Sequence, residues 1–126
     1  MSSDTEARLS EERVWGGFTR FTLNQPSTVK ILHLHAGRST SLQSHSCRDE
    51  LWIALDDGLV AWIRDEPREL QRGEEFFVPR GVLHRIESTV EGARILEISF
   101  GDFSEDDIVR YDAGAANGHP PPDPRA

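Results

Sequence analysis

Four side chains that could bind a metal ion lie in two short segments of the sequence. The segments run from Gly37 to Glu50 and from Gly73 to His84, and their oxygen or imidazole-nitrogen donors belong to Gln43, His45, Glu50 and His84. Imidazole suits zinc, iron, nickel and copper, while carboxylate and amide oxygens extend the choice to manganese. The set contains no thiolate, which disfavours a purely structural zinc site. Two imidazoles with oxygen donors leave room for water or substrate, so the set predicts one divalent metal ion at a catalytic site.

These donors need strands and a tertiary fold to bring them together. Gln43 and His45 are two positions apart, so they share a face if their segment is a strand. Glu50 begins the next apolar stretch, and His84 must arrive from a distant strand. The alternative is that polar residues at strand ends only satisfy backbone groups. The glycines that punctuate both segments, and Pro79 in the second, make the metal site the more specific interpretation.

Between the chain ends, apolar residues recur with a period of two, which is typical of strands. Lys30, Leu32 and Leu34 share one face of such a strand, and Asp56-Asp57-Gly58 is a tight-turn signal between two apolar stretches. Many short strands with Gly and Pro turns predict an all-β sandwich or barrel. The expected elements are strands at 18–23, 29–35, 51–55, 59–63, 75–78, 83–88 and 93–100, and one helical turn within 103–109 that Ser104 would cap.

Length and composition restrict the class of protein. The chain has 126 residues, enough for one domain. We expect a flexible N-terminal segment at 1–12, the folded domain at 13–112 and a disordered Pro/Gly-rich tail at 113–126. The net charge of -8 argues against a nucleic-acid partner, because phosphate backbones require a basic surface. No apolar run approaches the roughly 18 residues of a membrane span, and the single cysteine, Cys47, fits a reducing compartment. A cytoplasmic location is therefore expected.

The two donor segments resemble the two motifs of the cupin family. The second cupin motif is Gly, five residues, Pro, one, Gly, two, His, and it fits from Gly73 to His84 without a gap. The first motif fits from Gly37 to Glu50, with Gln43 in place of its first His. Ser88 stands where the second motif usually has Asn. The resemblance implies a single-domain cupin β-barrel, or jelly roll, with the metal inside it.

Within the cupins, the chain is similar to the type II phosphomannose isomerase module, which usually forms the C-terminal part of bifunctional mannose-1-phosphate guanylyltransferases. The segment from Gln43 to Trp52 resembles the Gln-x-His-x-x-Arg-x-Glu-x-Trp pattern of that module. The stretches 13–16, 30–37 and 105–111 resemble three further family patterns. The sequence contains no nucleotidyltransferase segment, so no sugar-nucleotide synthesis is expected from it. The aromatic-Gly-Arg ending that often follows the last pattern is also missing.

Lys30 and Arg110 are the catalytic candidates. Lys30 should point into the barrel, where it would either contact the substrate or form a structural ion pair with a carboxylate, because an inward lysine is costly unless paired. Arg110 matches an arginine that the resembled family needs for sugar-phosphate turnover. Its structural alternative is a surface salt bridge with Asp106 or Asp107.

Arg48 and Trp52 are the substrate-binding candidates. Arg48 lies between the donors, where it could bind phosphate through its planar guanidinium or orient Glu50. Trp52 falls on the face of Glu50 and should line the pocket. His33 and His35 lie on the strand face opposite Lys30, so we expect them outside the barrel.

The resemblance implies a metal-dependent isomerase of the mannose-6-phosphate isomerase type, which interconverts an aldose and a ketose phosphate through an enediol. The residues do not identify the general base, for which Lys30 is one candidate. Two alternatives remain: a metallo-cupin of other chemistry, such as a dioxygenase or tailoring enzyme, and a non-catalytic sugar-binding module. We expect one divalent metal ion, a sugar-phosphate substrate and a homodimer, with no nucleic-acid or membrane partner.

Overall fold

The computed structural model describes residues 8–101 and 104–111, and within them the chain is built almost entirely of strands. The all-β prediction is therefore confirmed. The tail expected at 113–126 lies outside the described residues, as does most of the segment at 1–12. The boundary expected after residue 12 falls inside the first strand, which begins at Leu9. None of the described residues belongs to a helix long and apolar enough to cross a membrane.

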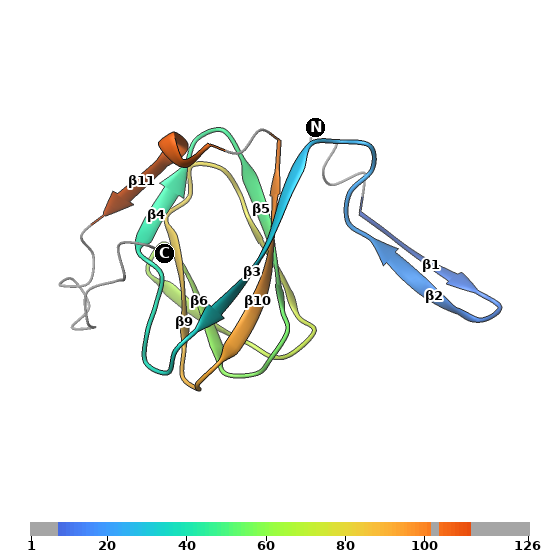
Figure 1. Cartoon of the computed structure of the whole chain (residues 1–126), viewed down its shortest axis with the longest axis horizontal. Coiled ribbons are helices and arrows are strands. Elements are labelled where there is room, and N and C mark those ends of the chain that lie inside the picture. The colour runs from blue at the N-terminus through green and yellow to red at the C-terminus, as the bar shows by residue number, and fades with distance from the viewer. Residues whose placement is uncertain (1–7, 102–103, 112–126) are drawn as a thin grey trace.

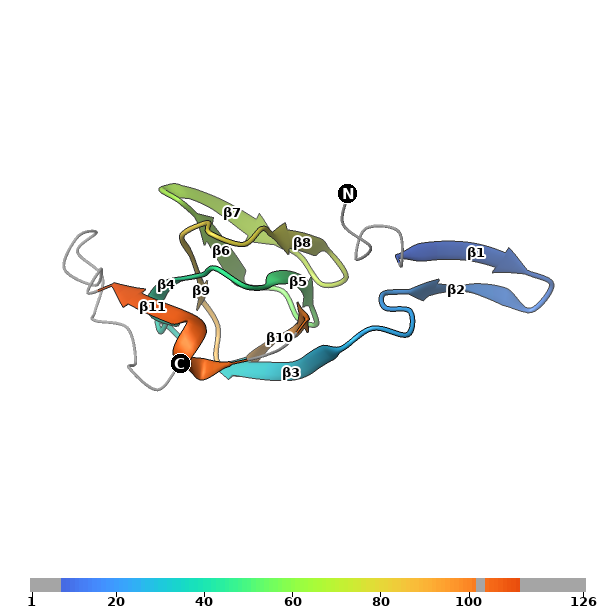
Figure 2. The same ribbon diagram turned by 90° about the horizontal axis from the view of Figure 1, so that it is seen from above.

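Two antiparallel sheets face each other and enclose the core (Figure 1). The strand order is β3-β10-β5-β8 in the four-stranded sheet and β11-β4-β9-β6-β7 in the five-stranded sheet. Figure 2 shows the hairpin of β1 and β2 projecting from this body. The strands are β1 (Leu9–Arg13), β2 (Gly16–Arg20), β3 (Ser27–Leu34), β4 (Leu42–His45), β5 (Asp49–Ala54), β6 (Leu59–Ile63), β7 (Glu66–Leu70), β8 (Glu75–Val78), β9 (His84–Ser88), β10 (Ala93–Phe100) and β11 (Ile108–Tyr111).

The space between the sheets is apolar at one end and polar at the other. Along β10, the inward side chains run from Ala93 and Ile95 to Glu97 and Ser99, and all four are buried. The neighbouring strand β5 runs antiparallel and pairs Ser99 with Glu50, so the polar residues of both strands meet at the same end. The apolar end holds the main core, which comprises Leu34, Trp52, Ala54, Leu59, Ala61, Leu70, Val78, Ile86, Ala93 and Ile95. This core packs beneath the buried polar residues at the other end of the barrel.

The turn at Asp56-Asp57-Gly58 carries the chain from one sheet to the other. β5 pairs with β10 and β8, whereas β6 pairs with β7 and β9, so the predicted tight turn joins two strands that do not pair with each other. Gly58 has a φ of 87°, and a Cβ there would lie 2.7 Å from the Val90 side chain. The turn therefore needs glycine for both its backbone conformation and the close approach of the neighbouring loop.

The sequence did not predict β1, β7 or β11, and the strand expected at 18–23 has different bounds. β7 contains Pro67 among charged residues, so it has no period-two apolar pattern, and the structure places it at the edge of its sheet, where proline is tolerated. The helical turn expected in 103–109 is a 3-10 turn at Glu105–Asp107, which β11 follows directly. Ser104 caps this turn as predicted, since its hydroxyl accepts a hydrogen bond from the Asp106 amide at 3.2 Å. The strand expected at 18–23 begins earlier, because Gly16 and Gly17 pair with β1.

Candidate metal centre

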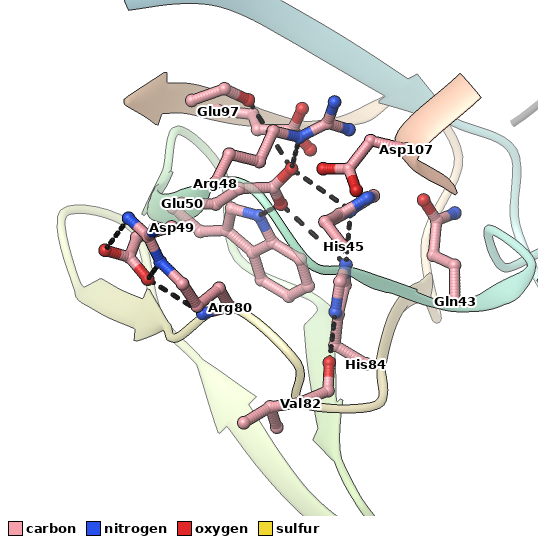
Figure 3. A network of polar contacts seen from close by, with 12 residues as sticks. Gln43, His45, Arg48, Asp49, Glu50, Arg80, Val82, His84, Glu97 and Asp107 are labelled. Carbon is pink, nitrogen blue, oxygen red and sulfur yellow. Dashed lines mark hydrogen bonds and ion pairs between the residues drawn. The ribbon is translucent and has the colours of Figure 1, made fainter. Parts of the chain in front are cut away.

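Three of the four predicted donors converge at the polar end of the barrel. β4 supplies His45, β5 supplies Glu50 and β9 supplies His84, and all three side chains are buried. The Nε2 atoms of the two histidines lie 3.1 Å apart. Glu50 places Oε2 at 3.3 Å from His45 Nε2 and Oε1 at 3.8 Å from His84 Nε2. Figure 3 shows the three side chains turned toward one another. They form a group whose ligand atoms all lie within 4.8 Å of one another.

The spacing of these atoms fits a shared metal ion. Donors bound at about 2.0–2.2 Å to one ion, with ligand angles near the tetrahedral value, lie roughly 3.3–3.6 Å from each other. The observed separations of 3.1, 3.3 and 3.8 Å bracket that range. His84 donates from Nδ1 to the Val82 carbonyl at 2.9 Å, which leaves its Nε2 lone pair directed at the group. A backbone acceptor of this kind is the usual partner of a metal-binding imidazole.

Both histidines favour the neutral form that binds metal. Burial lowers the pKa of His45 to about 3, and the nearby His84 and Arg48 add to this effect. Burial also lowers the pKa of His84, against the opposing effects of Glu50 and the Val82 carbonyl. Metal ligation requires unprotonated imidazole. Protons therefore compete weakly for these two nitrogens near neutral pH.

Glu50 is held by a network of donors. Trp52 donates from Nε1 to Oε1 at 3.1 Å, while the Arg48 guanidinium and the Ser99 hydroxyl reach Oε2 at 3.2 and 3.4 Å. Arg48 is buried and also donates to the Ser104 carbonyl at 3.3 Å. Two roles were predicted for Arg48, phosphate binding and orientation of Glu50, and these contacts agree with the second. Trp52 likewise contacts Glu50, and its ring packs edge-on against His84 with 5.5 Å between centroids.

Gln43 lies beside this group but has a different set of contacts. It faces His84 in the register between β4 and β9 and is buried. Its amide nitrogen donates to the hydroxyl and carbonyl of Ser41 at 2.9 and 3.3 Å, which leaves the amide oxygen as its possible metal donor. Ligation by Gln43 stays a prediction.

Asp107 fixes the loop between the donor strands, a role that the sequence did not reveal. Its carboxylate accepts hydrogen bonds from the Ser46 hydroxyl at 2.6 Å and from the amides of Ser46 and Cys47 at 3.0 and 2.9 Å. The hydrogen bond from the Ser46 side chain is the main reason that the pKa of Asp107 falls to about 2. The 3-10 turn therefore anchors the segment that joins His45 to Glu50. Cys47 itself is exposed.

A cavity of about 250 Å³ opens beside the group of His45, Glu50 and His84. Lys30, Arg48, Glu97 and Arg110 contribute to its walls, together with Trp52. The Lys30 ammonium lies 3.7 Å from Glu97 Oε1, so Lys30 points inward as predicted and has a carboxylate partner. Arg110 pairs in register with Gln43 and is exposed, which puts it at the solvent side of the wall. His33 and His35 are exposed, as predicted.

Glu97 is the wall residue that sequence reasoning missed. The sequence feature that could have predicted Glu97 is its position in the strand at 93–100, where the period of two places it on the inward face between Ile95 and Ser99. Burial and the neighbouring charge of Glu50 raise its pKa to about 7, while Lys30 and Arg48 act in the opposite direction. The cavity therefore holds a carboxyl group that changes charge near neutral pH.

Comparison with known proteins gives this site a family context. The family model described as mannose-6-phosphate isomerase C-terminal matches residues 2–113. The chain is 30% identical over 102 residues to xanthan biosynthesis protein XanB of Xanthomonas campestris pv. campestris, an alignment that covers 79% of this chain and 22% of that protein. It is 29% identical over 116 residues to a mannose-1-phosphate guanylyltransferase of Sinorhizobium fredii, with 86% and 23% covered. The chain thus spans less than a quarter of either relative.

A solved structure supports the architecture. A cupin-2 domain containing protein from Shewanella frigidimarina is 26% identical, with a TM-score of 0.52 over 60% of this chain and 71% of that chain. The shared fold and the match over 2–113 agree with the motifs in the sequence. The chain therefore belongs to the mannose-6-phosphate isomerase C-terminal family and has the cupin β-barrel fold.

Proposed function

We propose that this protein is a metal-dependent isomerase that interconverts an aldose phosphate and a ketose phosphate, with mannose 6-phosphate and fructose 6-phosphate as the first pair to test. The observation that carries the proposal is the buried group of His45, Glu50 and His84 beside a cavity to whose walls Lys30, Arg48 and Arg110 contribute. A divalent ion bound there would act as a Lewis acid on the sugar carbonyl. The family match over 2–113 supports the same chemistry.

The residues around the cavity suit the two parts of such a substrate. Arg110 lies at the exposed end, where a guanidinium can bind a phosphate through two parallel hydrogen bonds. Lys30 lies deeper and can donate to a sugar hydroxyl while it stays near Glu97. Arg48 is held by Glu50 and Ser104, so in this proposal it keeps Glu50 oriented and adds positive charge to the wall.

The test is a coupled assay of fructose 6-phosphate formation with protein of known metal content. Arg110→Ala should raise the KM for mannose 6-phosphate at least tenfold, and Arg110→Lys should recover part of the loss because it restores the charge without the planar fork. Arg94→Ala is the matched control, since Arg94 is exposed and pairs with Asp56 away from the cavity. Sugar-phosphate binding without turnover by metal-loaded wild type would instead identify a binding module. Oxygen uptake would identify a redox metalloenzyme.

We also propose a homodimer and keep the cytoplasmic location as a prediction. The outer face of the four-stranded sheet exposes Val29, Ile31 and Phe77 at 56%, 48% and 44%, and burial of such side chains favours association. Light scattering after gel filtration should give twice the chain mass. A monomeric mass at micromolar concentration would contradict this part of the proposal.

A further inference from the structure

Glu97 stands in the cavity wall beside Lys30. In the barrel register it pairs with Lys30 on β3 and with Trp52 on β5, and its side chain lies on the inward face of β10. Only 7% of the residue is exposed. Among the described residues that line the cavity, the acidic ones are Glu50 and Glu97. Glu97 is therefore a carboxyl group placed where a bound sugar would lie.

The carboxylate of Glu50 and the imidazoles of His45 and His84 contact one another. Both oxygens of Glu50 accept hydrogen bonds from Trp52 or Arg48 and face the two histidines. The Nε2 atoms of His45 and His84 point into the same group. Lys30 is a cation beside Glu97, which suits it to donate a hydrogen bond and not to accept a proton. Glu97 has its ion-pair partner in the Lys30 ammonium, which lies 3.7 Å from Oε1, and it is not a member of the group formed by His45, Glu50 and His84.

The charges around Glu97 favour a proton-transfer role. Burial is the largest influence on its pKa, followed by Glu50 from β5, and both raise it toward 7. Lys30 from β3 and Arg48 from the loop before β5 lower it. Efficient general bases have pKa values close to the working pH, because both the free and the protonated form are then accessible.

We propose that Glu97 is the general base that moves the substrate proton between C2 and C1, an inference that rests on the isomerase function proposed above. The Glu97 carboxylate takes the proton from C2 of the open-chain aldose, and the C–H electron pair forms the C1–C2 double bond. The carbonyl π pair moves onto O1, which takes a proton from water. Glu97 then returns its proton to C1 through the enediol π pair, O2 gives its proton to water as the O–H pair forms the C2 carbonyl, and the ketose results. Atoms and electrons balance within the substrate, so no co-reactant is consumed.

The experiment compares metal-loaded wild type with Glu97→Gln, and uses Glu69→Gln on the exposed face of β7 as the control. Glu97→Gln should lower kcat at least a hundredfold, since general bases typically contribute about 10² to 10⁴ in rate. Binding of mannose 6-phosphate, measured by calorimetry, should change less than threefold. In D2O, wild type should incorporate deuterium at carbon and Glu97→Gln should not. Glu69→Gln should match wild type in all three measurements.

A rescue experiment separates the chemical role from a structural one. Glu97→Ala removes the carboxylate and leaves space, so added formate should restore part of its kcat and the deuterium incorporation. If Glu97→Gln unfolds, this rescue still tests the proposal. Retention of kcat within threefold in Glu97→Gln would overturn the role of Glu97 and leave the isomerase intact. Loss of deuterium incorporation in Lys30→Met but not in Glu97→Gln would transfer the role to Lys30. A wild type inactive on every sugar phosphate tested would overturn both proposals.

Discussion

Replacement of Glu97 by Gln should change how the stability of the metal-free protein depends on pH. The pKa of Glu97 rises from an ordinary 4.5 to about 7 because the side chain is buried beside Glu50. The unfolded chain therefore ionises this carboxyl at lower pH than the folded protein does. The contribution of Glu97 to stability is fully present below pH 4.5 and is lost as the pH rises through 7.

The size of the effect follows from the same pKa values. Movement of a pKa from 4.5 to about 7 corresponds to about 3 kcal/mol between the protonated and ionised forms. Gln cannot ionise, so Glu97→Gln avoids this loss. The variant gives up the interaction with Lys30, which is worth less than about 1 kcal/mol because that lysine side chain is 40% exposed. The stability of the variant relative to wild type should therefore rise by about 2–3 kcal/mol between pH 4.5 and pH 8.

Urea unfolding at pH 4.5, 6, 7 and 8, in the presence of a chelator, measures this difference. The m-values of the two proteins should agree at each pH, so that the midpoints report stability alone. His45 and His84 have lowered pKa values, and their contribution is lost as the pH falls below 6.5 toward 3. This loss is common to both proteins and cancels in the comparison. Glu69→Gln, on the exposed face of β7, is the control for the removal of one carboxylate charge. A pH-independent difference for Glu97→Gln would refute the assignment of a raised pKa to this group.

Four further outcomes are expected. His84→Ala should reduce bound metal from about one ion per chain to near zero by elemental analysis, because it removes one of three converging donors. Metal affinity of wild type should fall less than tenfold between pH 7 and 5.5 in titration calorimetry, since the pKa of His45 is about 3; a steep loss centred on pH 6.5 would contradict this. Glu50→Ala in the metal-free protein should cost about 3–5 kcal/mol in urea unfolding, because it leaves Arg48 buried without its carboxylate. Leu59→Ala should cost about 2–5 kcal/mol by the same assay, since Leu59 is fully buried.

The types of donor side chain at the candidate site and the class of fold could be predicted from the sequence. Period-two alternation is local, and it correctly predicted the inward face of Lys30 and the outward face of His33. The motif spacing identified His45, Glu50 and His84 before any geometry was known. Such inferences succeed because a side chain's face in a strand depends on its own position and on little else.

The tertiary structure decided how distant segments pair and how deeply each side chain is buried. The turn at Gly58 has the sequence of a hairpin, yet β5 and β6 enter different sheets because each finds its partners elsewhere in the chain. Glu97 looks like one more charged residue in a strand, and only the surrounding barrel removes it from water and sets it near Glu50 and Lys30. Strand pairing and pKa values both depend on contacts between residues that lie far apart in the sequence. Local sequence patterns therefore cannot predict them.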